Sequence, residues 1–338
     1  MKITFLCPHL RIAGGVRAIL TYADLLTVGG HDVTVVVPAK SRGRAFWRSV
    51  TGAGPDWMRG FRARVTWVDR WRSNALPDGD AIVATAWRSA AVAAEAPARC
   101  GRKFYFVQHY ESLYHGRAET VDATYRLPLR KIVISTWLRD IMRERFASDA
   151  EVLVTPVDPL LFHAVPVTVA TSRPRVLMLH HEYAWKGTAD GFETVARVKQ
   201  RVPGLFLVGF GVDPPKGRAS YDEFHADLPQ DKLATLYSGC DIYLCPSWDE
   251  GLGMPPMEAM ACGAALVTYD NGGCRDYAHD EETALVARRR DVADLAAKLE
   301  RLAIDEPLRV RIAAAGSAFI RNTFDWGRTA RRMAAIFR

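Results

Sequence analysis

The chain has 338 residues, of which 49% are hydrophobic and 25% are charged. This is the composition of a soluble globular protein, and the length exceeds what one hydrophobic core usually organises, so we expect two domains. No apolar run approaches the roughly 20 residues that cross a bilayer, and residues 1–7 lack the long apolar region of a signal peptide. We therefore expect a cytoplasmic protein. The formal net charge of +7 favours partners that carry phosphate or anionic lipid.

The cysteines give no sign of an oxidising compartment. None of the six forms a CxxC pair, and their spacing is not that of a secreted disulfide framework. We expect reduced thiols that serve mainly in packing. They stand at positions 7, 100, 240, 245, 262 and 274.

Short apolar runs alternate with helical patterns through the first half of the chain. A strand at 3–7, a helix at 16–28 and a strand at 32–38 form the opening βαβ unit of a parallel sheet. Residues 1–165 are therefore predicted to form a Rossmann-like domain. Further strands are predicted at 81–86, 103–108, 131–136 and 151–156.

Prolines and small residues interrupt this periodicity at 156–175 and indicate a linker. A second alternation of strands and helices follows, so residues 170–320 are predicted to form a second Rossmann-like domain. The fold class is α/β, with two doubly wound halves in tandem. Strands of the second half are predicted at 175–180, 204–209, 241–247, 264–269 and 283–287.

Two loops that follow predicted strands are candidate anion sites, because ligands of parallel α/β sheets bind beyond the carboxyl ends of the strands. Gly14-Gly15 follows the first strand of the first half, where it allows a backbone to approach a phosphate closely. Lys186 follows the first strand of the second half, just before a helix. An ordinary βα turn and a solvated lysine are the alternative interpretations.

The segment 246–263 is the densest in such features. Glu250 follows a predicted buried strand, two glycines keep the loop thin, and Pro255-Pro256 begins a helix that carries Glu258. A glutamate there could serve only as a favourable charge near a helix N-terminus, worth about 0.3–1 kcal/mol. Two carboxylates that bracket a glycine-rich turn are harder to explain by packing.

Glu250 and Glu258, separated by seven residues, resemble the E-x7-E motif of retaining GT-B glycosyltransferases of family GT4, glycosyltransferase group 1. The resemblance extends over nearly the whole chain, through the early diglycine, Lys186-Gly187, the loop 271–273 and the helical pattern at the C-terminus. It implies two Rossmann-like domains facing across a cleft, of which the first binds the acceptor. It also implies that a segment 321–338 packs back on the first domain.

Roles for single residues follow from the resemblance. Glu258 is expected to bind the ribose hydroxyls of a nucleotide sugar, Glu250 the donor sugar, and Lys186 the diphosphate. His109 is expected near the anomeric carbon, so that the implied catalytic residues are Glu250, Lys186 and His109. The implied donor-binding residues are Gly14, Gly15, His181, Lys186, Glu250, Gly251, Leu252, Gly253 and Glu258.

One departure from the family concerns His181, which stands where many relatives have an arginine five residues before the lysine. An imidazole is a weaker phosphate clamp than a guanidinium. This feature favours the alternative of a non-catalytic nucleotide-sugar-binding subunit. Inverting transferases and epimerases of the same fold remain further alternatives that E-x7-E disfavours, and no G-x-G-x-x-G supports a dehydrogenase.

We expect neither a metal nor a cofactor. A lysine and helix N-termini can stabilise the diphosphate leaving group without a metal. Asp-x-Asp binds metal in another glycosyltransferase fold, but the sequence Asp-Gly-Asp at 78–80 follows a proline and precedes a strand, so we interpret it as a turn.

Residues 42–72 contain eight arginines, two aspartates and four tryptophans. Arginine with interfacial tryptophan suits an anionic membrane, which would place the protein at the inner face of the membrane and favour a lipid-linked acceptor. Solvated arginines with core tryptophans are the alternative, and a soluble small molecule is then the acceptor. A glycan is the third class of acceptor. No nucleic-acid recognition motif accompanies the charge, so no nucleic-acid partner is expected.

Overall fold

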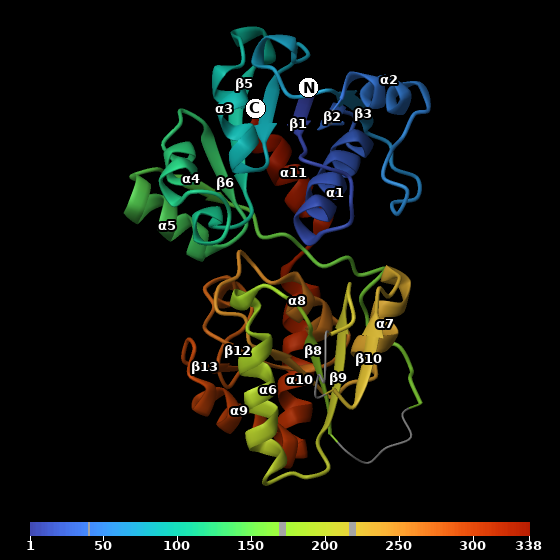
Figure 1. Cartoon of the computed structure of the whole chain (residues 1–338), viewed down its shortest axis with the longest axis vertical. Coiled ribbons are helices and arrows are strands. Elements are labelled where there is room, and N and C mark those ends of the chain that lie inside the picture. Colours follow the sequence, from blue (N-terminus) through green and yellow to red (C-terminus); the bar gives the residue numbers. More distant parts are fainter. Residues whose placement is uncertain (40, 169–173, 216–220) are drawn as a thin grey trace. The chain divides into compact units, whose positions relative to one another are not determined.

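The computed structural model describes residues 1–39, 41–168, 174–215 and 221–338 (Figure 1). The chain forms two compact units, one of residues Met1–Thr155 with Trp326–Arg338, the other of Pro156–Asp325. The first unit thus ends earlier than the predicted boundary at 165, and the predicted segment 321–338 is divided between the units. Of the predicted linker 156–175, residues 169–173 lie outside the described part.

The first unit contains a seven-stranded sheet in the order β3-β2-β1-β4-β5-β6-β7, and every pairing is parallel. The order reverses direction between β1 and β4, which is the switch point of a doubly wound sheet. Strand β3 lies inside the arginine-rich stretch and is not among the predicted strands. The strands are β1 Lys2–Leu6, β2 Asp32–Pro38, β3 Arg64–Val68, β4 Ala81–Ala84, β5 Arg102–Val107, β6 Arg130–Val133 and β7 Ala150–Val152.

Helices cover both faces of this sheet, and the last helix of the chain packs against the first (Figure 1). Phe337 places its ring 4.8 Å from that of Phe104 and 6.2 Å from that of Phe5, and Trp326 lies 5.0 Å from Tyr22. The C-terminal helix is therefore part of this core. The helices are α1 Gly14–Val28, α2 Arg42–Val50, α3 Trp87–Glu95, α4 Ala118–Tyr125, α5 Thr136–Phe146 and α11 Trp326–Phe337.

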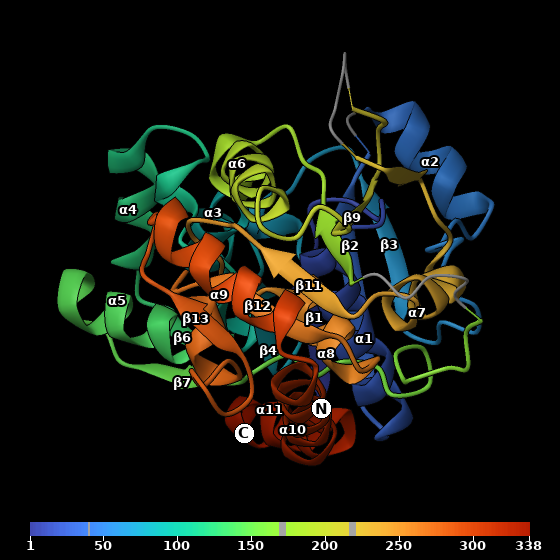
Figure 2. The same cartoon turned by 90° about the horizontal axis from the view of Figure 1, so that it is seen from below.

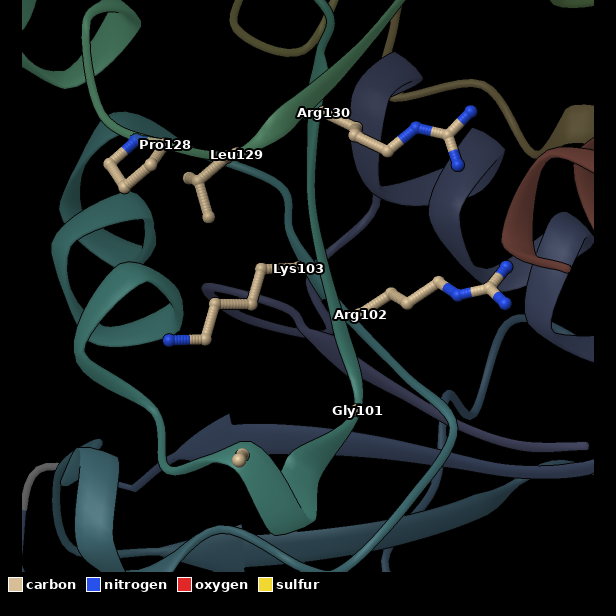
Figure 3. A pocket seen from close by; sticks show the side chains of 7 residues that line it. Gly101, Arg102, Lys103, Pro128, Leu129 and Arg130 are labelled. Carbon is tan, nitrogen blue, oxygen red and sulfur yellow. The ribbon is translucent and has the colours of Figure 1, made fainter.

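A pocket of about 630 Å³ lies at the amino ends of β5 and β6, and Figure 3 shows its cationic side chains turned to opposite sides. Lys103 Nζ donates to the Ala94 carbonyl of α3 (2.5 Å). Arg102 and Arg130 donate to the carbonyls of Phe337 and Ile336 in α11. These cations bond the last carbonyls of two helices, which accounts for them structurally.

The second unit contains six parallel strands in the order β10-β9-β8-β11-β12-β13. Helices α6 and α9 pack together on one face, and α8 and α10 pack together on the other (Figure 2). The strands are β8 Arg175–Leu179, β9 Phe206–Gly211, β10 Glu223–Ala226, β11 Ile242–Cys245, β12 Ala265–Tyr269 and β13 Leu285–Ala287. The helices are α6 Thr188–Lys199, α7 Gln230–Ser238, α8 Met254–Ala261, α9 Val292–Ile304 and α10 Glu306–Thr323.

The predicted α/β class, with two Rossmann-like sheets, is confirmed. All six cysteines are buried and unpaired with one another, as expected for reduced packing residues. Among the described residues, no helix is long and apolar enough to cross a membrane.

Candidate donor-binding site

The loop between β11 and α8 lies against the loop that follows β12. The Glu250 amide donates to the Asn271 carbonyl (3.0 Å), and Glu250 forms an isolated parallel bridge with Gly272. A Cβ on Gly273 would lie 2.7 Å from the backbone nitrogen of Leu252, so only glycine allows this approach. The two loops therefore fix the backbone of Glu250.

Helix α8 begins directly after this loop. Its N-cap residue, Gly253, has φ of +92°, and a Cβ there would meet the Tyr277 hydroxyl at 2.6 Å. Pro255 and Pro256 carry no N–H, so the first turn has backbone N–H groups only at Met254 and Met257. No side chain of the described residues caps the helix, which makes these two groups the candidate donors to an anion or a hydroxyl. Gly251, Leu252 and Gly253 are themselves buried and form the wall of the loop.

Gly187 brings a second loop of the same unit to this place. Its φ is +67°, and a Cβ would lie 1.9 Å from the Pro246 carbonyl oxygen, so the loop after β8 can touch the loop after β11 only with glycine there. Lys186 ends a short 3-10 helix just before it. The consequence is a contact between two residues that are 64 positions apart, Lys186 and Glu250.

Lys186 Nζ donates to Glu250 Oε1 at 2.7 Å. The side chains are 22% and 11% exposed, so the pair is largely withdrawn from water. Burial opposes the charge of the lysine, but the charge of Glu250 and its hydrogen bond outweigh burial, and the pKa of Lys186 is raised. The site therefore holds a fixed ammonium beside a fixed carboxylate at the carboxyl edge of the sheet.

Glu258 occupies a separate position on α8. It is 3% exposed, and Tyr237 of α7 donates its hydroxyl to Glu258 Oε2 at 3.1 Å. Burying a carboxylate is costly unless hydrogen bonds compensate it, so this position is not a plain surface charge at a helix end. The two carboxylates of the motif thus have different partners, a lysine in one case and a tyrosine in the other.

His181 lies in the same loop as Lys186 but does not replace an arginine as a fixed charge. The Tyr183 amide donates to His181 Nδ1 (3.1 Å), so the neutral ring carries its proton on Nε2. Burial and the charge of Lys186 lower the pKa of His181, which keeps the ring neutral at pH 7. The ring centroid of Tyr183 lies 4.4 Å from that of His181 and 4.3 Å from that of Trp185, a stack that the sequence did not predict.

Residues outside the motif brace the loop after β11. Asp190, in the first turn of α6, accepts hydrogen bonds from Trp248 Nε1 (2.9 Å) and the Tyr269 hydroxyl (3.2 Å). Arg289 pairs with Asp249, and the guanidinium of Arg290 lies 3.9 Å from the Trp248 ring. An aspartate in the first turn of a predicted helix was the available signal for this network, but an acidic residue there has an ordinary explanation.

The first unit groups its own candidates at the carboxyl edge of its sheet. Gly14 and Gly15 open α1, whose N-cap Ala13 is extended and provides no side-chain bond. A Cβ on Gly15 would lie 3.2 Å from the side-chain oxygen of Gln108, the residue before His109. The start of α1, with its diglycine, therefore lies next to the loop after β5 that carries His109.

A buried network holds the loop of His109. The Tyr125 hydroxyl donates to the His109 carbonyl (3.4 Å) and accepts from the Glu111 amide (3.0 Å). Glu111 Oε2 accepts from the Trp87 amide (2.9 Å) and the Tyr105 hydroxyl (3.1 Å). Burial raises the pKa of Glu111 to about 7, although both hydrogen bonds act to lower it. None of this was predicted from the sequence.

Asp78 and Asp80 have structural partners at the opposite, amino edge of the first sheet. Asp80 Oδ2 accepts from the Lys2 amide (2.7 Å), and Asp78 pairs with Arg99. Within the described ranges, no group of three or more His, Cys, Asp or Glu is placed to hold a metal ion.

Comparison with known proteins agrees with this geometry. Residues 222–319 match the family model described as Glycosyl transferases group 1. A Campylobacter jejuni N,N'-diacetylbacillosaminyl-diphospho-undecaprenol alpha-1,3-N-acetylgalactosaminyltransferase is 30% identical over 146 residues, which are 42% of this chain and 38% of that protein. The chain thus matches well under half the length of this curated relative.

Two solved structures have the same fold along the whole chain. Sucrose-phosphate synthase from Thermosynechococcus elongatus has a TM-score of 0.80 at 17% identity and covers 99% of this chain and 98% of its own. The Anabaena protein Alr3699/HepE, in complex with UDP-glucose, has a TM-score of 0.73 at 16% identity and covers 99% of both chains. The expected GT-B fold and the expected resemblance to glycosyltransferase group 1 are confirmed.

Proposed function

We propose that this chain, whose residues 222–319 belong to the glycosyl transferases group 1 family, transfers a sugar from a nucleotide sugar to an acceptor hydroxyl with retention of configuration. The observation that carries the proposal is the buried Lys186–Glu250 pair at the N-terminus of the helix that bears Glu258. A cation, a carboxylate and uncapped amides at one sheet edge suit a diphosphate and a sugar hydroxyl in adjacent positions.

The chemistry requires stabilisation of a leaving diphosphate. Negative charge develops on the bridging oxygen as the glycosidic bond to phosphate breaks, and a fixed ammonium in a dry site stabilises it. Lys186 would exchange the Glu250 carboxylate for phosphate oxygens, and Glu250 would then accept hydrogen bonds from the sugar. The acceptor hydroxyl attacks from the face of the leaving group, and the departing phosphate takes its proton, so no protein nucleophile is needed.

The comparisons support the substrate classes. The Anabaena structure contains UDP-glucose, which makes a uridine diphosphate sugar the first donor to test. The name of the Campylobacter relative describes transfer of a sugar to a diphospho-undecaprenol-linked acceptor, which supports a lipid-linked or other cell-envelope glycan as the acceptor. We propose further that transfer needs no metal, because the ammonium and the helix amides supply the positive field.

The test separates the roles of the two carboxylates. Glu258→Gln should weaken binding of a nucleoside diphosphate in calorimetry about tenfold or more, because it removes the charged acceptor for the ribose hydroxyls. Glu250→Gln should bind the nucleoside diphosphate nearly as the wild type does and should lose turnover with the complete donor. Glu282→Gln, an exposed residue of the same unit, is the matched control. Full activity and affinity in both motif variants would refute the assignment.

One observation favours a second candidate, a nucleotide-sugar-binding subunit without catalysis. His181 is neutral at pH 7, so the site has one fixed cation fewer than a site with arginine there. Slow release of nucleoside diphosphate from the donor without acceptor would exclude this candidate, since a merely binding protein leaves the glycosyl bond intact. Binding of donor with no release under any condition would favour it.

We also propose that α2 docks on an anionic membrane. Phe46, Trp47 and Val50 are each about 70% exposed on a helix that carries Arg42 and no acidic residue in its first turn. Basic side chains near such a surface are each worth about 1 kcal/mol, and tryptophan settles at the interface. The other tryptophans of this stretch belong to the protein: Trp67 is buried, and Trp57 and Trp71 donate to backbone carbonyls.

Co-sedimentation with vesicles of phosphatidylglycerol tests this docking. Trp47→Ser should reduce the bound fraction at low salt, and raised salt should reduce it further by screening. Ile304→Ser, which replaces another exposed apolar residue in the second unit, is the control and should have no effect. Wild-type protein that fails to bind such vesicles, or Trp47→Ser protein that binds equally, would contradict the proposal.

A further inference from the structure

A second cavity lies at the carboxyl edge of the first sheet, and none of the expected donor-binding residues lines it. It has a volume of about 800 Å³, within the range of small-molecule sites. Its walls come from the loop after β1, the end of β2, helix α2, the segment 53–56 and β3. The lining residues with side chains of chemical interest are His9, Arg11, Arg44, Arg48, Asp56 and Trp67.

Hydrogen bonds and a cation–π contact connect the segments that form the walls of this cavity. The Trp57 indole donates to the Leu10 carbonyl and the Trp67 indole donates to the Ala53 carbonyl, each at 2.7 Å. The guanidinium of Arg48 lies 4.2 Å from the Trp67 ring, a cation–π contact between α2 and β3. The cavity is therefore a built pocket rather than a gap beside loose loops.

The pocket is cationic and contains an unsatisfied polar atom. Three arginines line it against the single carboxylate of Asp56. Nδ1 of His9 is buried and has no partner within hydrogen-bond geometry among the described residues. Burial and the charge of Arg11 lower the pKa of the ring, and a hydrogen bond to the Arg11 backbone acts to raise it. Native proteins rarely leave a buried polar atom unpaired without a reason such as a ligand. An anion beside the ring would favour the protonated form, in which both nitrogens donate.

We propose that this pocket binds a phosphate group of the acceptor. The inference rests on the proposed function, because it assumes a transferase with an acceptor site in the first unit. Guanidinium groups match phosphate oxygens in planar, paired hydrogen bonds, and the volume leaves room for the sugar or lipid headgroup that bears the phosphate. The loop after β1 that supplies His9 and Arg11 to the pocket leads directly into Gly14-Gly15 at the start of α1, so the acceptor phosphate and the donor amides would lie along one continuous segment.

The imidazole signals of His9 in the full chain, labelled with ¹⁵N-histidine, provide the test. The His9→Gln variant assigns the signal. Titration with glycerol 3-phosphate at constant ionic strength should shift the His9 signal in a saturable way. Arg44→Gln should weaken the apparent affinity about tenfold, since one charge-assisted contact is lost.

The controls keep the result specific. Arg42→Gln removes a charge from the same helix but not from the pocket lining, and it should leave the affinity unchanged. Arg11→Gln, a change in an exposed loop, replaces Arg44→Gln if that variant folds poorly. A His9 signal that shifts neither with glycerol 3-phosphate nor with phosphatidylglycerol vesicles, or a shift that Arg44→Gln and Arg11→Gln both leave unchanged, would overturn the inference.

Two further arms identify the source of the phosphate and separate this inference from the proposed function. A response to glycerol 3-phosphate supports a soluble phosphorylated acceptor, and a response only to phosphatidylglycerol vesicles assigns the phosphate to a lipid headgroup. Donor binding is measured on the same wild-type protein. If nucleotide sugars bind and no phosphate probe shifts the His9 signal, the phosphate pocket is refuted and the proposed function is not. If His9 responds but no nucleotide sugar binds, the phosphate site stands and its role as an acceptor site falls with the proposed function.

Discussion

Glu111 makes the stability of the first unit dependent on pH. Its pKa is about 7 in the folded protein, against an ordinary value of 4.5, because burial disfavours the carboxylate. The folded protein therefore binds a proton more tightly than the unfolded chain does. The contribution of Glu111 is fully present below pH 4.5 and is lost as the pH rises toward 7.

The size of the effect follows from the two pKa values. One pKa unit corresponds to about 1.36 kcal/mol, so the interval from 4.5 to about 7 corresponds to a loss of about 3 kcal/mol of unfolding free energy. Glu111→Gln removes this titration. The amide oxygen of the glutamine can still accept from the Trp87 amide and the Tyr105 hydroxyl, so the hydrogen bonds of the loop are retained.

Urea unfolding between pH 4.5 and pH 8, followed by tryptophan fluorescence, measures the difference. Seven of the nine tryptophans lie in the first unit, so the signal reports mainly on it. The unfolding free energy of Glu111→Gln minus that of the wild type should grow by about 3 kcal/mol across this range. Glu119→Gln, an exposed glutamate on α4, controls for the loss of one carboxylate. A difference that stays flat with pH would refute the reasoning.

Three further predictions concern the site, the metal and the C-terminal helix. Lys186→Ala should lower kcat/KM about 100- to 1,000-fold through loss of charge at the leaving diphosphate, whereas Lys199→Ala should not, and equal steady-state kinetics of the two variants would remove Lys186 from the site. Activity should persist in EDTA, and a loss that Mg²⁺ restores would contradict metal-free transfer. Phe337→Ala should cost about 3–5 kcal/mol of unfolding free energy, because its ring packs in the first core, whereas Arg331→Ala on the same helix should cost little. A near-neutral Phe337→Ala variant would show that the helix does not stabilise this core.

The alternation of apolar runs predicted most of the sheet architecture, because central strands of parallel sheets are buried on both faces and read as continuous apolar segments. Two edge strands were missed for the same reason. Strand β10 has the sequence Glu-Phe-His-Ala and is only half buried, and β3 lies among arginines and tryptophans. An edge strand does not need an apolar run, so periodicity alone does not reveal it.

In the candidate site, too, some features were predicted from the sequence and others were not. Its loops were predictable from glycines and charges at the ends of predicted strands. The contact between Lys186 and Glu250 was not, since it depends on the close approach of Gly187 to Pro246 across two loops. The stack on His181 and the network of Glu111 also depend on tertiary packing that no local pattern encodes.

The most direct test of the central claim is the release of nucleoside diphosphate from a panel of nucleotide sugars, beginning with UDP-glucose, in the absence of acceptor. The wild-type protein should release nucleoside diphosphate slowly from at least one donor, and Lys186→Ala should abolish most of that release. A wild-type protein that neither binds nor cleaves any nucleotide sugar, or a Lys186→Ala protein that cleaves as fast as the wild type, would contradict the claim.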